Sequence, residues 1–433
     1  MKSSSLPPPT SLSQNFSWTL IGNLVYSACQ WGMLIILAKL GTPEMVGEFT
    51  FALATAAPLF MFTNLQLRVV QATDSNTQYL FCDYLSLRLV ASLAAVLGLV
   101  CIAFSMFVPS RELAYLIICI GLAKAVESIS DVCYGLVQQH ERMDIISISL
   151  IFKGLLSLLF LASGVHIFGT VLGGTIGLIL AWLILLLVYD LPKTYGFIKR
   201  SETPFARTLW LRWHWPTQLK LIGLTLPLGF VMLLVSLNTN IPRYFIEHYL
   251  SPRDLGIFAA IAYLMMVGSI IQGAMAQAAT PRLAKYYADG QRKAFAMLLS
   301  KQIGMAMLLG LAAVIISAIA GKQILTIIYK PEYAQYSQLL VMLMLAAALE
   351  YICSFLGSGI TAARYFRSQV PLFATTACIL AIACMVFIPM SGLNGIPWAM
   401  ILTGLIRIFL FVGILIHALR KPNPIEHNKP SII

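Results

Sequence analysis

Charged residues are scarce in this chain. Asp, Glu, Lys and Arg together make up only 11% of its 433 residues, whereas hydrophobic residues make up 59%, and the mean hydropathy is +0.83. In soluble domains about one quarter of the residues are charged, so this chain cannot cover a water-exposed surface with polar groups. The shortage of charge therefore predicts an integral membrane protein.

The sequence also lacks the motifs that carry covalent or metal chemistry. Its eight cysteines lie in or beside apolar runs and form neither a Cys-x-x-Cys pair nor a Cys/His metal spacing, so we expect neither disulfides nor zinc. Gly321-Lys322 is followed by Gln323, which breaks the pattern of a phosphate-binding loop. Nucleophile-elbow and metalloprotease motifs are missing as well. We therefore expect no catalytic residue, cofactor or bound metal, and we expect an ion gradient or the substrate gradient to supply any energy.

Long apolar runs are what the sequence has in abundance. A helix that crosses the hydrocarbon core needs about 20 mostly apolar residues, and twelve runs meet that length, which predicts an all-α fold. The first 14 residues contain no apolar signal-peptide core, so we expect the first run to stay in the membrane. The expected spans are Trp18–Leu40, Gly47–Leu67, Ser86–Phe107, Leu113–Gly135, Ile145–Ser163, Phe168–Tyr189, Leu221–Asn240, Asp254–Thr280, Phe295–Ala320, Ser337–Ile360, Pro371–Met390 and Ile396–Leu419.

Lysine and arginine are concentrated on one side of the predicted membrane. With the N-terminus inside, 20 of the 29 fall in inner segments and 6 at outer ends, a bias that predicts cytoplasmic termini. The net charge of +12 is then explained by the basic inner segments, so it implies no nucleic-acid partner. The longest connection is basic and rich in tryptophan, which predicts an interfacial linker. The expected division is a tail (1–17), a six-span lobe (18–189), the linker (190–220), a second six-span lobe (221–419) and a tail (420–433).

Two short stretches, one in each half, are nearly the same. TPEMVGEF (Thr42–Phe49) joins the first and second spans, and SPRDLGIF (Ser251–Phe258) joins the seventh and eighth. In both, a hydroxyl residue and a proline end one helix, and an acidic residue suits the start of the next. An even number of crossings separates the two turns, so we expect parallel repeats related by an axis along the membrane normal. Two such lobes with a cleft between them are a transporter architecture.

Six charged residues lie inside predicted spans, where a charged side chain is costly. Those in the fourth span follow the spacing i, i+3, i+7 and share one helix face. Two interpretations are open: structural pairs that neutralise each other, Lys124 with Glu127 and Arg407 with Glu350, or a water-filled cavity that receives an anionic substrate. In the second, the carboxylates would also bind and release H⁺ or Na⁺. The six are Lys124, Glu127, Asp131, Lys153, Glu350 and Arg407.

Three stretches in the second half carry a family resemblance. NIPRYFIEHYLSPRDLGIFAAIAYL (Asn240–Leu264), ATPRLAKYY (Ala279–Tyr287) and IYKPEYAQY (Ile328–Tyr336) resemble bacterial polysaccharide flippases, the O-antigen and capsule translocases of the multidrug/oligosaccharidyl-lipid/polysaccharide exporter superfamily. The resemblance covers nearly the whole chain. It implies a monomer in the bacterial cytoplasmic membrane whose two lobes form a V, as in MATE transporters, and open alternately to either face. It also implies that a short glycan on undecaprenyl pyrophosphate is carried to the outer leaflet for O-antigen, capsule or exopolysaccharide synthesis, alongside a polysaccharide polymerase and a chain-length regulator.

This implied cargo matches the charges inside the spans. Cations would bind the pyrophosphate and any acidic sugars, asparagines would bind glycan hydroxyls, and the lipid tail would trail through the gap between the lobes. Carboxylates would couple transport to H⁺ or Na⁺. Candidate substrate-binding residues are Arg68, Lys124, Lys153, Asn238, Asn240, Arg243 and Arg407, and candidate ion-coupling residues are Glu127, Asp131 and Glu350.

Two other functions fit part of the pattern. A MATE-type drug or cation antiporter would have the same lobes, but it needs a cavity dominated by acidic and aromatic residues, whereas the charges here are balanced and Arg243 adds a cation. A glycan polymerase or ligase typically needs a substantial outer loop, and the longest outer segments here have about fifteen residues.

Pro227 and Gly229 in the seventh span predict either a hinge or a packing contact.

Overall fold

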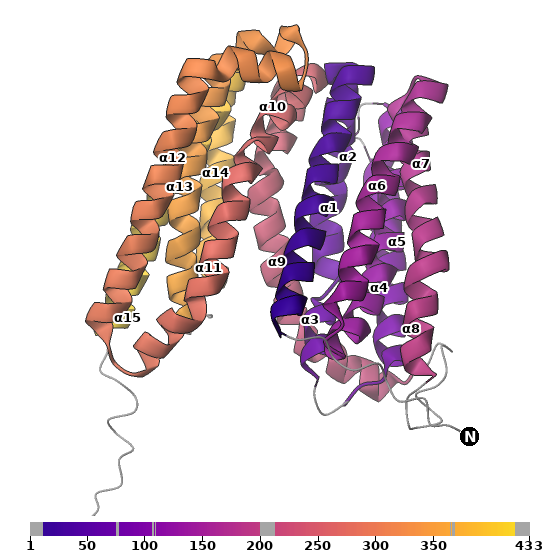
Figure 1. Cartoon of the computed structure of the whole chain (residues 1–433). Coiled ribbons are helices and arrows are strands. Elements are labelled where there is room, and N and C mark those ends of the chain that lie inside the picture. The colour runs from indigo at the N-terminus through magenta and orange to yellow at the C-terminus, as the bar shows by residue number, and fades with distance from the viewer. Residues whose placement is uncertain are drawn as a thin grey trace, which may run out of the picture. The chain divides into compact units, whose positions relative to one another are not determined.

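The computed structural model describes residues 12–74, 78–105, 108, 110–199, 213–363, 365 and 369–420. Within these ranges every regular element is helical (Figure 1), which confirms the predicted all-α membrane fold. Eleven segments of the described chain are long and apolar enough to cross a membrane. They fall into two compact units, Met1–Asn240 and Ile241–Ile433, each of which is described by itself below.

The last of the eleven segments, Gln369–Arg420, contains two of the predicted spans. Its helices α14 (Gln369–Ser391) and α15 (Gly395–Arg420) pack against each other and are joined by a short 3-10 turn at Gly392–Asn394. Gly392 has a φ of +57°, a left-handed conformation that glycine adopts at little cost and that lets the chain reverse. The number of twelve spans remains a prediction.

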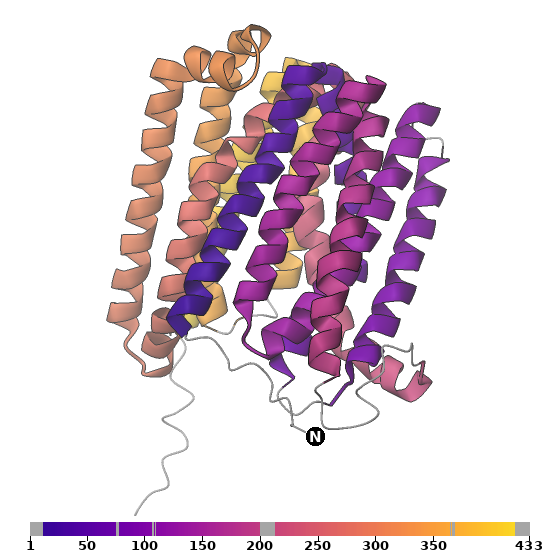
Figure 2. The same ribbon diagram turned by 45° about the vertical axis from the view of Figure 1, so that its right-hand side comes forward.

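Unit 1 contains the helices coloured from indigo to magenta in Figure 1. They are α1 (Leu12–Leu40), α2 (Pro43–Thr63), α3 (Leu67–Thr73), α4 (Phe81–Ala103), α5 (Arg111–Gln139), α6 (Met143–Phe168), α7 (Val171–Leu185), the π-helical turn η1 (Leu186–Asp190), α8 (Leu191–Ile198) and most of α9 (Trp215–Tyr249). α5 lies at the centre and packs against α2, α3, α4, α6 and α7, while α1 lies along α6 (Figure 2). Leu67, Tyr84 and Val132 belong to a buried cluster that joins α3, α4 and α5. This packing places the charged face of α5 inside the unit.

Unit 2 is organised around one central helix in the same way. It contains the end of α9, then α10 (Pro252–Tyr263), α11 (Met265–Ala288), α12 (Arg292–Ile328), the 3-10 helix η3 (Pro331–Tyr336), α13 (Ser337–Ala362), α14 and α15. α13 packs against α10, α11, α12 and α15. Its Tyr351 and Phe355 are buried against Ala276 of α11 and Ala306 of α12. Small residues on the neighbouring helices let the large aromatic side chains of α13 fit between them.

The two units meet in sequence between Asn240 and Ile241, inside α9. The described parts of the predicted linker, 190–220, are helical at both ends, because α8 extends the sixth predicted span to Ile198 and α9 begins at Trp215. Residues 200–212, which include part of the tryptophan-rich stretch, lie outside the described residues. The division of the chain at 190–220 stays a prediction.

The two similar turns begin helices by the same mechanism. Thr42 accepts a hydrogen bond from the Met45 backbone N–H at its N-cap position, and Ser251 accepts one from the Asp254 N–H at 3.2 Å. A proline follows each cap in the first helical turn, where its missing N–H costs nothing. The helix-starting role predicted for both stretches is confirmed.

Three predicted spans contain a helix break or a π-helical turn, and the third, Ser86–Phe107, runs past the end of α4 at Ala103. The second, Gly47–Leu67, ends early because α2 stops at Thr63 and Leu65 and Gln66 adopt left-handed φ angles of 51° and 52° before α3 begins. The eighth, Asp254–Thr280, divides at Leu264 into α10 and α11, and the sixth contains η1. Hydropathy measures only apolar length, so it detects none of these changes in backbone geometry.

Pro227 and Gly229 lie within α9, which is helical from Trp215 to Tyr249. A side-chain carbon added at Gly229 would lie 2.8 Å from the Phe62 carbonyl oxygen of α2. The rings of Phe62 and Phe230 meet edge to face, with centroids 5.0 Å apart. Gly229 therefore allows the close packing of α9 on the end of α2, which was one of the two interpretations of this stretch.

Candidate functional site: a cation-lined cavity in unit 1

A cavity of about 630 Å³ lies within unit 1 and is lined by α1, α2, α3, α5, α6 and α9. Its volume is within the range of small-molecule binding sites. Five charged side chains line it, and all five are predicted site residues. They are Arg68 of α3, Lys124, Glu127 and Asp131 of α5, and Lys153 of α6. The structure thus brings together half of the predicted site.

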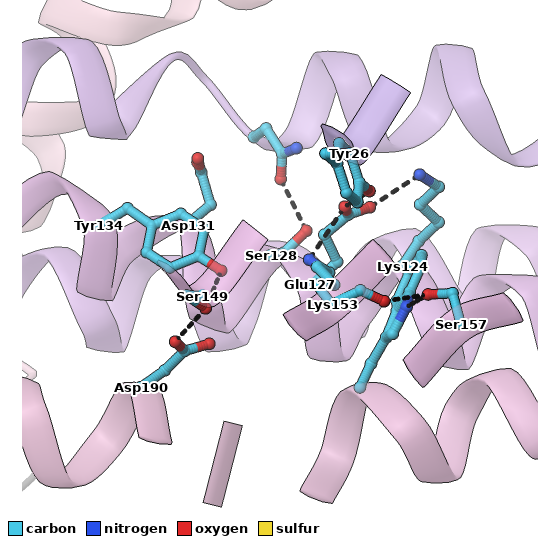
Figure 3. A network of polar contacts seen from close by, with 12 residues as sticks. Tyr26, Lys124, Glu127, Ser128, Asp131, Tyr134, Ser149, Lys153, Ser157 and Asp190 are labelled. Atoms are coloured by element: carbon cyan, nitrogen blue, oxygen red, sulfur yellow. Dashed lines mark hydrogen bonds and ion pairs between the residues drawn. The ribbon is translucent and has the colours of Figure 1, made fainter. Parts of the chain in front are cut away.

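Glu127 lies between two lysines (Figure 3). Lys124 Nζ is 2.7 Å from Glu127 Oε2, and Lys153 Nζ is 3.0 Å from Glu127 Oε1. The Tyr26 hydroxyl of α1 donates a further hydrogen bond to Oε1 at 2.9 Å. The contact between Lys124 and Glu127 is the i, i+3 pair expected from the sequence. Because one carboxylate faces two ammonium groups, this cluster retains one positive charge.

The two lysines differ in their freedom to move. Lys153 is 2% exposed, and its Nζ lies 4.7 Å from the centre of the Trp182 ring of α7. The Lys124 side chain is 30% exposed, and its Nζ lies 5.5 Å from the same ring. The Trp182 Nε1–H donates to Ser157 Oγ at 2.7 Å, which fixes the indole. Lys153 is therefore held in place, whereas Lys124 is able to exchange its carboxylate for another anion.

Asp131 lies one turn further along α5 and is shared by two arginines. Arg88 Nη2 is 3.0 Å from Asp131 Oδ2, and Arg68 Nη1 is 3.6 Å from Oδ1. Arg88 of α4 is fully buried and also donates to Asn64 Oδ1, which accepts a second hydrogen bond from Ser128. A buried guanidinium needs such partners because its desolvation costs several kcal/mol. Asp131 therefore pairs mainly with Arg88 and holds Arg68 only loosely.

Arg68 reaches the cavity from the break between α2 and α3. Its Nε donates to Gln138 Oε1 at 3.0 Å, and its guanidinium lies 5.4 Å from the centre of the Tyr134 ring. The side chain is 28% exposed. A guanidinium carries five N–H donors in a planar fork, so Arg68 retains donors for a ligand while Gln138 and Tyr134 keep its position.

The charges around the cavity favour an anion. Three lining cations face two lining carboxylates, and the buried Arg88 adds a fourth cation next to Asp131. Lysine and arginine form short, charge-assisted hydrogen bonds with phosphate and carboxylate oxygens. The low dielectric constant of the surrounding helices strengthens these interactions relative to water. The cavity is therefore suited to bind a phosphate-bearing ligand.

Asn238 and Asn240, which are predicted to bind glycan hydroxyls, do not line this cavity. Their side-chain amides donate to carbonyl groups one turn back on the same helix, Asn238 to Leu234 and Asn240 to Ser236, each at 2.9 Å. Such local bonds satisfy a polar side chain inside an apolar helix. A contact with substrate stays a prediction for both.

The other three predicted residues belong to unit 2. Glu350 of α13 and Arg407 of α15 form the ion pair that was one of the two interpretations of these charges. The Glu350 side chain is 50% exposed and that of Arg407 is 14% exposed, so the carboxylate still faces the surroundings of the unit. Arg243 lies near the end of α9. A substrate or coupling role for the three remains a prediction.

The residues that support the lining charges, Arg88, Tyr26 and Trp182, are not among the predicted site residues. The predicted third span, Ser86–Phe107, places Arg88 at its cytoplasmic end, but α4 begins at Phe81 and Arg88 lies two turns inside it, fully buried. The apolar residues Phe81 and Leu85 just before Arg88 are the signal that could have extended this span. Tyr26 and Trp182 carry no comparable signal, because aromatic residues are common in any membrane helix.

Comparison with known proteins agrees with the predicted family. Residues 12–287 match the family described as polysaccharide biosynthesis protein. The capsular polysaccharide biosynthesis protein CapF of Staphylococcus aureus is 28% identical over 388 residues, which cover 88% of this chain and 93% of that protein.

Solved structures share the fold at low sequence identity. A multidrug resistance MATE transporter in an inward-facing conformation matches with a TM-score of 0.71 at 11% identity, over 92% of this chain and 98% of that one. The lipid II flippase MurJ in an inward closed conformation matches with a TM-score of 0.70 at 12% identity, over 93% and 90%. A transporter from Pyrococcus furiosus that is described as a member of the MOP superfamily, with a binding pocket of reverse polarity that suggests a different function, matches with a TM-score of 0.63 at 15% identity, over 94% and 95%. The fold is thus that of MATE transporters. Because the family match spans more than half of the length of the chain, this chain belongs to the polysaccharide biosynthesis protein family.

Proposed function

We propose that this protein is a flippase that moves a lipid-linked oligosaccharide from the cytoplasmic to the outer leaflet of the bacterial cytoplasmic membrane by alternating access. The observation that carries the proposal is the cavity in unit 1, where three cations face two carboxylates. The headgroup would be the pyrophosphate that links the glycan to undecaprenol. Membership of a polysaccharide biosynthesis family and similarity to a capsular polysaccharide protein support a glycan as the cargo.

Binding of a pyrophosphate would proceed by exchange of partners. Lys124 is partly exposed, and Arg68 lies 3.6 Å from the Asp131 carboxylate. Both can turn to the ligand, because Glu127 keeps Lys153 and Asp131 keeps Arg88 as a partner. Lys153 stays in place and adds a fixed positive charge. Glu127 and Asp131 then lose cation partners. We propose that these two carboxylates, with Glu350 of unit 2, take up H⁺ or Na⁺ and so couple transport to an ion gradient.

The remaining parts of the proposal concern the glycan and its surroundings. We propose that Asn238 and Asn240 contact sugar hydroxyls, and that Arg243 and Arg407 contact acidic sugars. We also propose that the protein is a monomer with cytoplasmic termini, and that it delivers its cargo to a polysaccharide polymerase that works with a chain-length regulator.

The charge of the cavity argues against export of cationic drugs, the alternative that shares this fold. A cationic ligand would meet Arg68, Lys124 and Lys153 with two carboxylates already engaged by those cations. It would have to displace an ammonium or guanidinium group from its carboxylate before it could pair with that carboxylate. An anionic ligand gains partners from the same rearrangement.

The test is the location of the lipid-linked glycan in cells that lack the gene. We expect undecaprenyl-linked units to accumulate on the cytoplasmic leaflet, out of reach of a periplasmic or external glycosidase, and surface polysaccharide to disappear. Expression of the wild-type chain should restore both. A Lys322→Gln variant, which changes an exposed lysine of α12 in unit 2, should restore export as well and serves as the control.

Two results would contradict the proposal. If the units still reach the outer leaflet and only their polymerisation fails, the protein is a polymerase or ligase. If glycan export is normal and the cells become sensitive to cationic drugs, it is a drug antiporter.

A further inference from the structure

Asp190 is a buried carboxylate that the proposed binding step does not use. It is 3% exposed and ends the π-helical turn η1, Leu186–Asp190. Ser149 of α6 donates to Asp190 Oδ1 at 2.6 Å. Asp190 Oδ2 is buried without a hydrogen-bond partner among the described residues. The ionised form therefore lacks a partner that a buried carboxylate needs.

A chain of hydroxyl groups connects Asp190 with the cavity (Figure 3). The side chain of Tyr134 lines the cavity, and its hydroxyl lies 2.8 Å from Ser149 Oγ. An ionised carboxylate only accepts hydrogen bonds, so Ser149 donates to Asp190, and Tyr134 must donate to Ser149. The chain thus has a direction, from the cavity towards Asp190.

The π-helical turn that ends at Asp190 is explained by the residues that follow it. Pro192 lies in the first turn of α8 and has no N–H, so regular helical bonding cannot continue through it. The preceding turn widens into η1, and Thr194 Oγ1 donates to the Asp190 carbonyl at 2.7 Å. Single π-helical turns inside longer helices are frequent at functional sites. Here the widened turn places a carboxylate at the end of the hydroxyl chain.

The groups that face Asp190 come from α5, α6, α8 and its own turn η1. Lys153, which is paired with Glu127, is the cation that interacts electrostatically with Asp190. α5 contributes the Ser130 hydroxyl, which lies near the carboxyl group, and α8 contributes the Thr194 hydroxyl, which is bonded to the Asp190 backbone carbonyl. The titratable groups around Asp190 are Cys133 and Tyr134 of α5, Lys153 of α6 and Tyr189 of η1. Protonation of Asp190 would remove the one negative charge from this set.

We propose that Asp190 is a proton-binding site that is filled from the cavity through Tyr134 and Ser149. A proton from the cavity binds the Tyr134 oxygen, the original Tyr134 proton passes to Ser149 Oγ, and the Ser149 proton passes to Asp190 Oδ1. One proton enters, each hydroxyl keeps one proton, and both hydrogen bonds reverse direction. Asp190 then donates to Ser149, and Ser149 donates to Tyr134.

The reversal links proton binding to the ligand. While Asp190 is ionised, Tyr134 uses its only proton on Ser149. After protonation, the new Tyr134 proton is available to an acceptor in the cavity, so an anionic ligand and the proton favour each other. This link to cargo rests on the proposed function, whereas proton binding by Asp190 does not.

Infrared difference spectroscopy of the purified full-length protein between mildly alkaline and mildly acidic pH tests the site directly, because a buried carboxylic acid has its own C=O stretch. We expect this band to appear in the wild type on acidification and to be lost in Asp190→Asn. It should persist in Glu127→Gln and Asp131→Asn. A band whose frequency and intensity are the same in Asp190→Asn as in the wild type, or the lack of any band in the wild type, would overturn the proposal.

The hydroxyl chain has its own pair of variants. Ser149→Ala removes the link between Tyr134 and Asp190 and should change the pH midpoint of the band, whereas Ser147→Ala, an equally buried serine on the same helix, should not. Identical midpoints in the two variants would overturn the path through Ser149. If Asp190→Asn fails to fold, Asp190→Glu should keep the band at a changed frequency, and an unchanged frequency would place the acid elsewhere. None of these measurements requires a glycan, so a protein that fails the export test can still show the proton site.

Discussion

The ammonium group of Lys153 lies 4.7 Å from the centre of the Trp182 ring, on a side chain that is almost completely buried. An aromatic face attracts a cation without neutralising it. A second carboxylate in the place of Trp182 would also hold the lysine, but it would cancel the remaining positive charge of the Lys124–Glu127–Lys153 cluster. Trp182 therefore fixes a buried lysine and leaves the cavity attractive to anions.

Replacement of Trp182 tests whether its ring supports Lys153 in the position that binds an anion. A cation–π contact contributes about 1 kcal/mol at an exposed site and about 2 kcal/mol when it is desolvated, which corresponds to roughly a 5- to 30-fold change in binding. We expect Trp182→Leu to weaken binding of inorganic pyrophosphate to the purified protein by about that factor, measured by titration calorimetry. Trp182→Phe loses the bond to Ser157 and part of the ring area but keeps an aromatic face towards Lys153, so it should have a smaller effect. Equal affinities in the wild type and Trp182→Leu would exclude the aromatic ring as a support for Lys153.

Replacement of Lys124 and replacement of Lys153 should have different effects on the free energy of unfolding but similar effects on ligand binding. Lys124→Gln removes a partly exposed ion pair, so we expect it to lower the free energy of unfolding by less than about 1 kcal/mol. Lys153→Gln removes a buried partner of Glu127 and should lower it by about 3 kcal/mol. Both should weaken pyrophosphate binding and abolish glycan export. Thermal unfolding and calorimetry measure the two quantities, with Lys322→Gln as the control for both. Normal export in the two variants would remove the cavity from the transport path.

Arg88 and Asp131 should behave as a coupled pair. Arg88→Gln leaves Asp131 without its main partner and removes one of the two hydrogen bonds that Asn64 Oδ1 accepts, so we expect a loss of about 3 kcal/mol in unfolding free energy. Asp131→Asn in the same chain should recover part of this loss, because no unpaired carboxylate remains. Thermal unfolding of the two single variants and the double variant gives the coupling energy. Additive effects would show that Arg88 acts without Asp131.

The ion pair of unit 2 is the place to separate structural pairing from a role in transport. If Arg407 and Glu350 only neutralise each other, the double variant Arg407→Gln/Glu350→Gln should export glycan normally. We expect instead that the double variant recovers stability relative to Arg407→Gln alone, since no unpaired charge remains, and still fails to export acidic glycan. Export in complemented cells and thermal unfolding provide the two readouts. Recovery of export together with stability would assign the pair to structure alone.

Much of the fold follows from local patterns in the sequence. The apolar runs locate the membrane helices because burial of a helix in lipid depends on length and hydropathy, which are local quantities. The i, i+3, i+7 spacing places Lys124, Glu127 and Asp131 on one face of α5 for the same reason. The caps at Thr42 and Ser251 are also local, since each involves atoms no more than three residues apart.

The helix breaks and supports depend on contacts that are distant in sequence. The side chain of Asn64, which follows the last residue of α2, accepts hydrogen bonds from Arg88 and Ser128, which lie 24 and 64 residues away. Lys153 depends on Trp182 and on Tyr26, which shares its carboxylate. Hydropathy counts Tyr26 and Trp182 as ordinary members of apolar helices, and it counts Arg88 as the end of one.

By itself, the sequence determined the membrane class, the helical content, the family and five charged residues of the cavity, because composition and helical periodicity act over short distances. Only the tertiary structure decided which of those charges are neutralised, which lysine is fixed and which can move, and that Asp190 connects with the cavity. Electrostatic energy inside a membrane helix bundle depends on distances of a few ångströms between separate helices. Those distances exist only after the helices have packed.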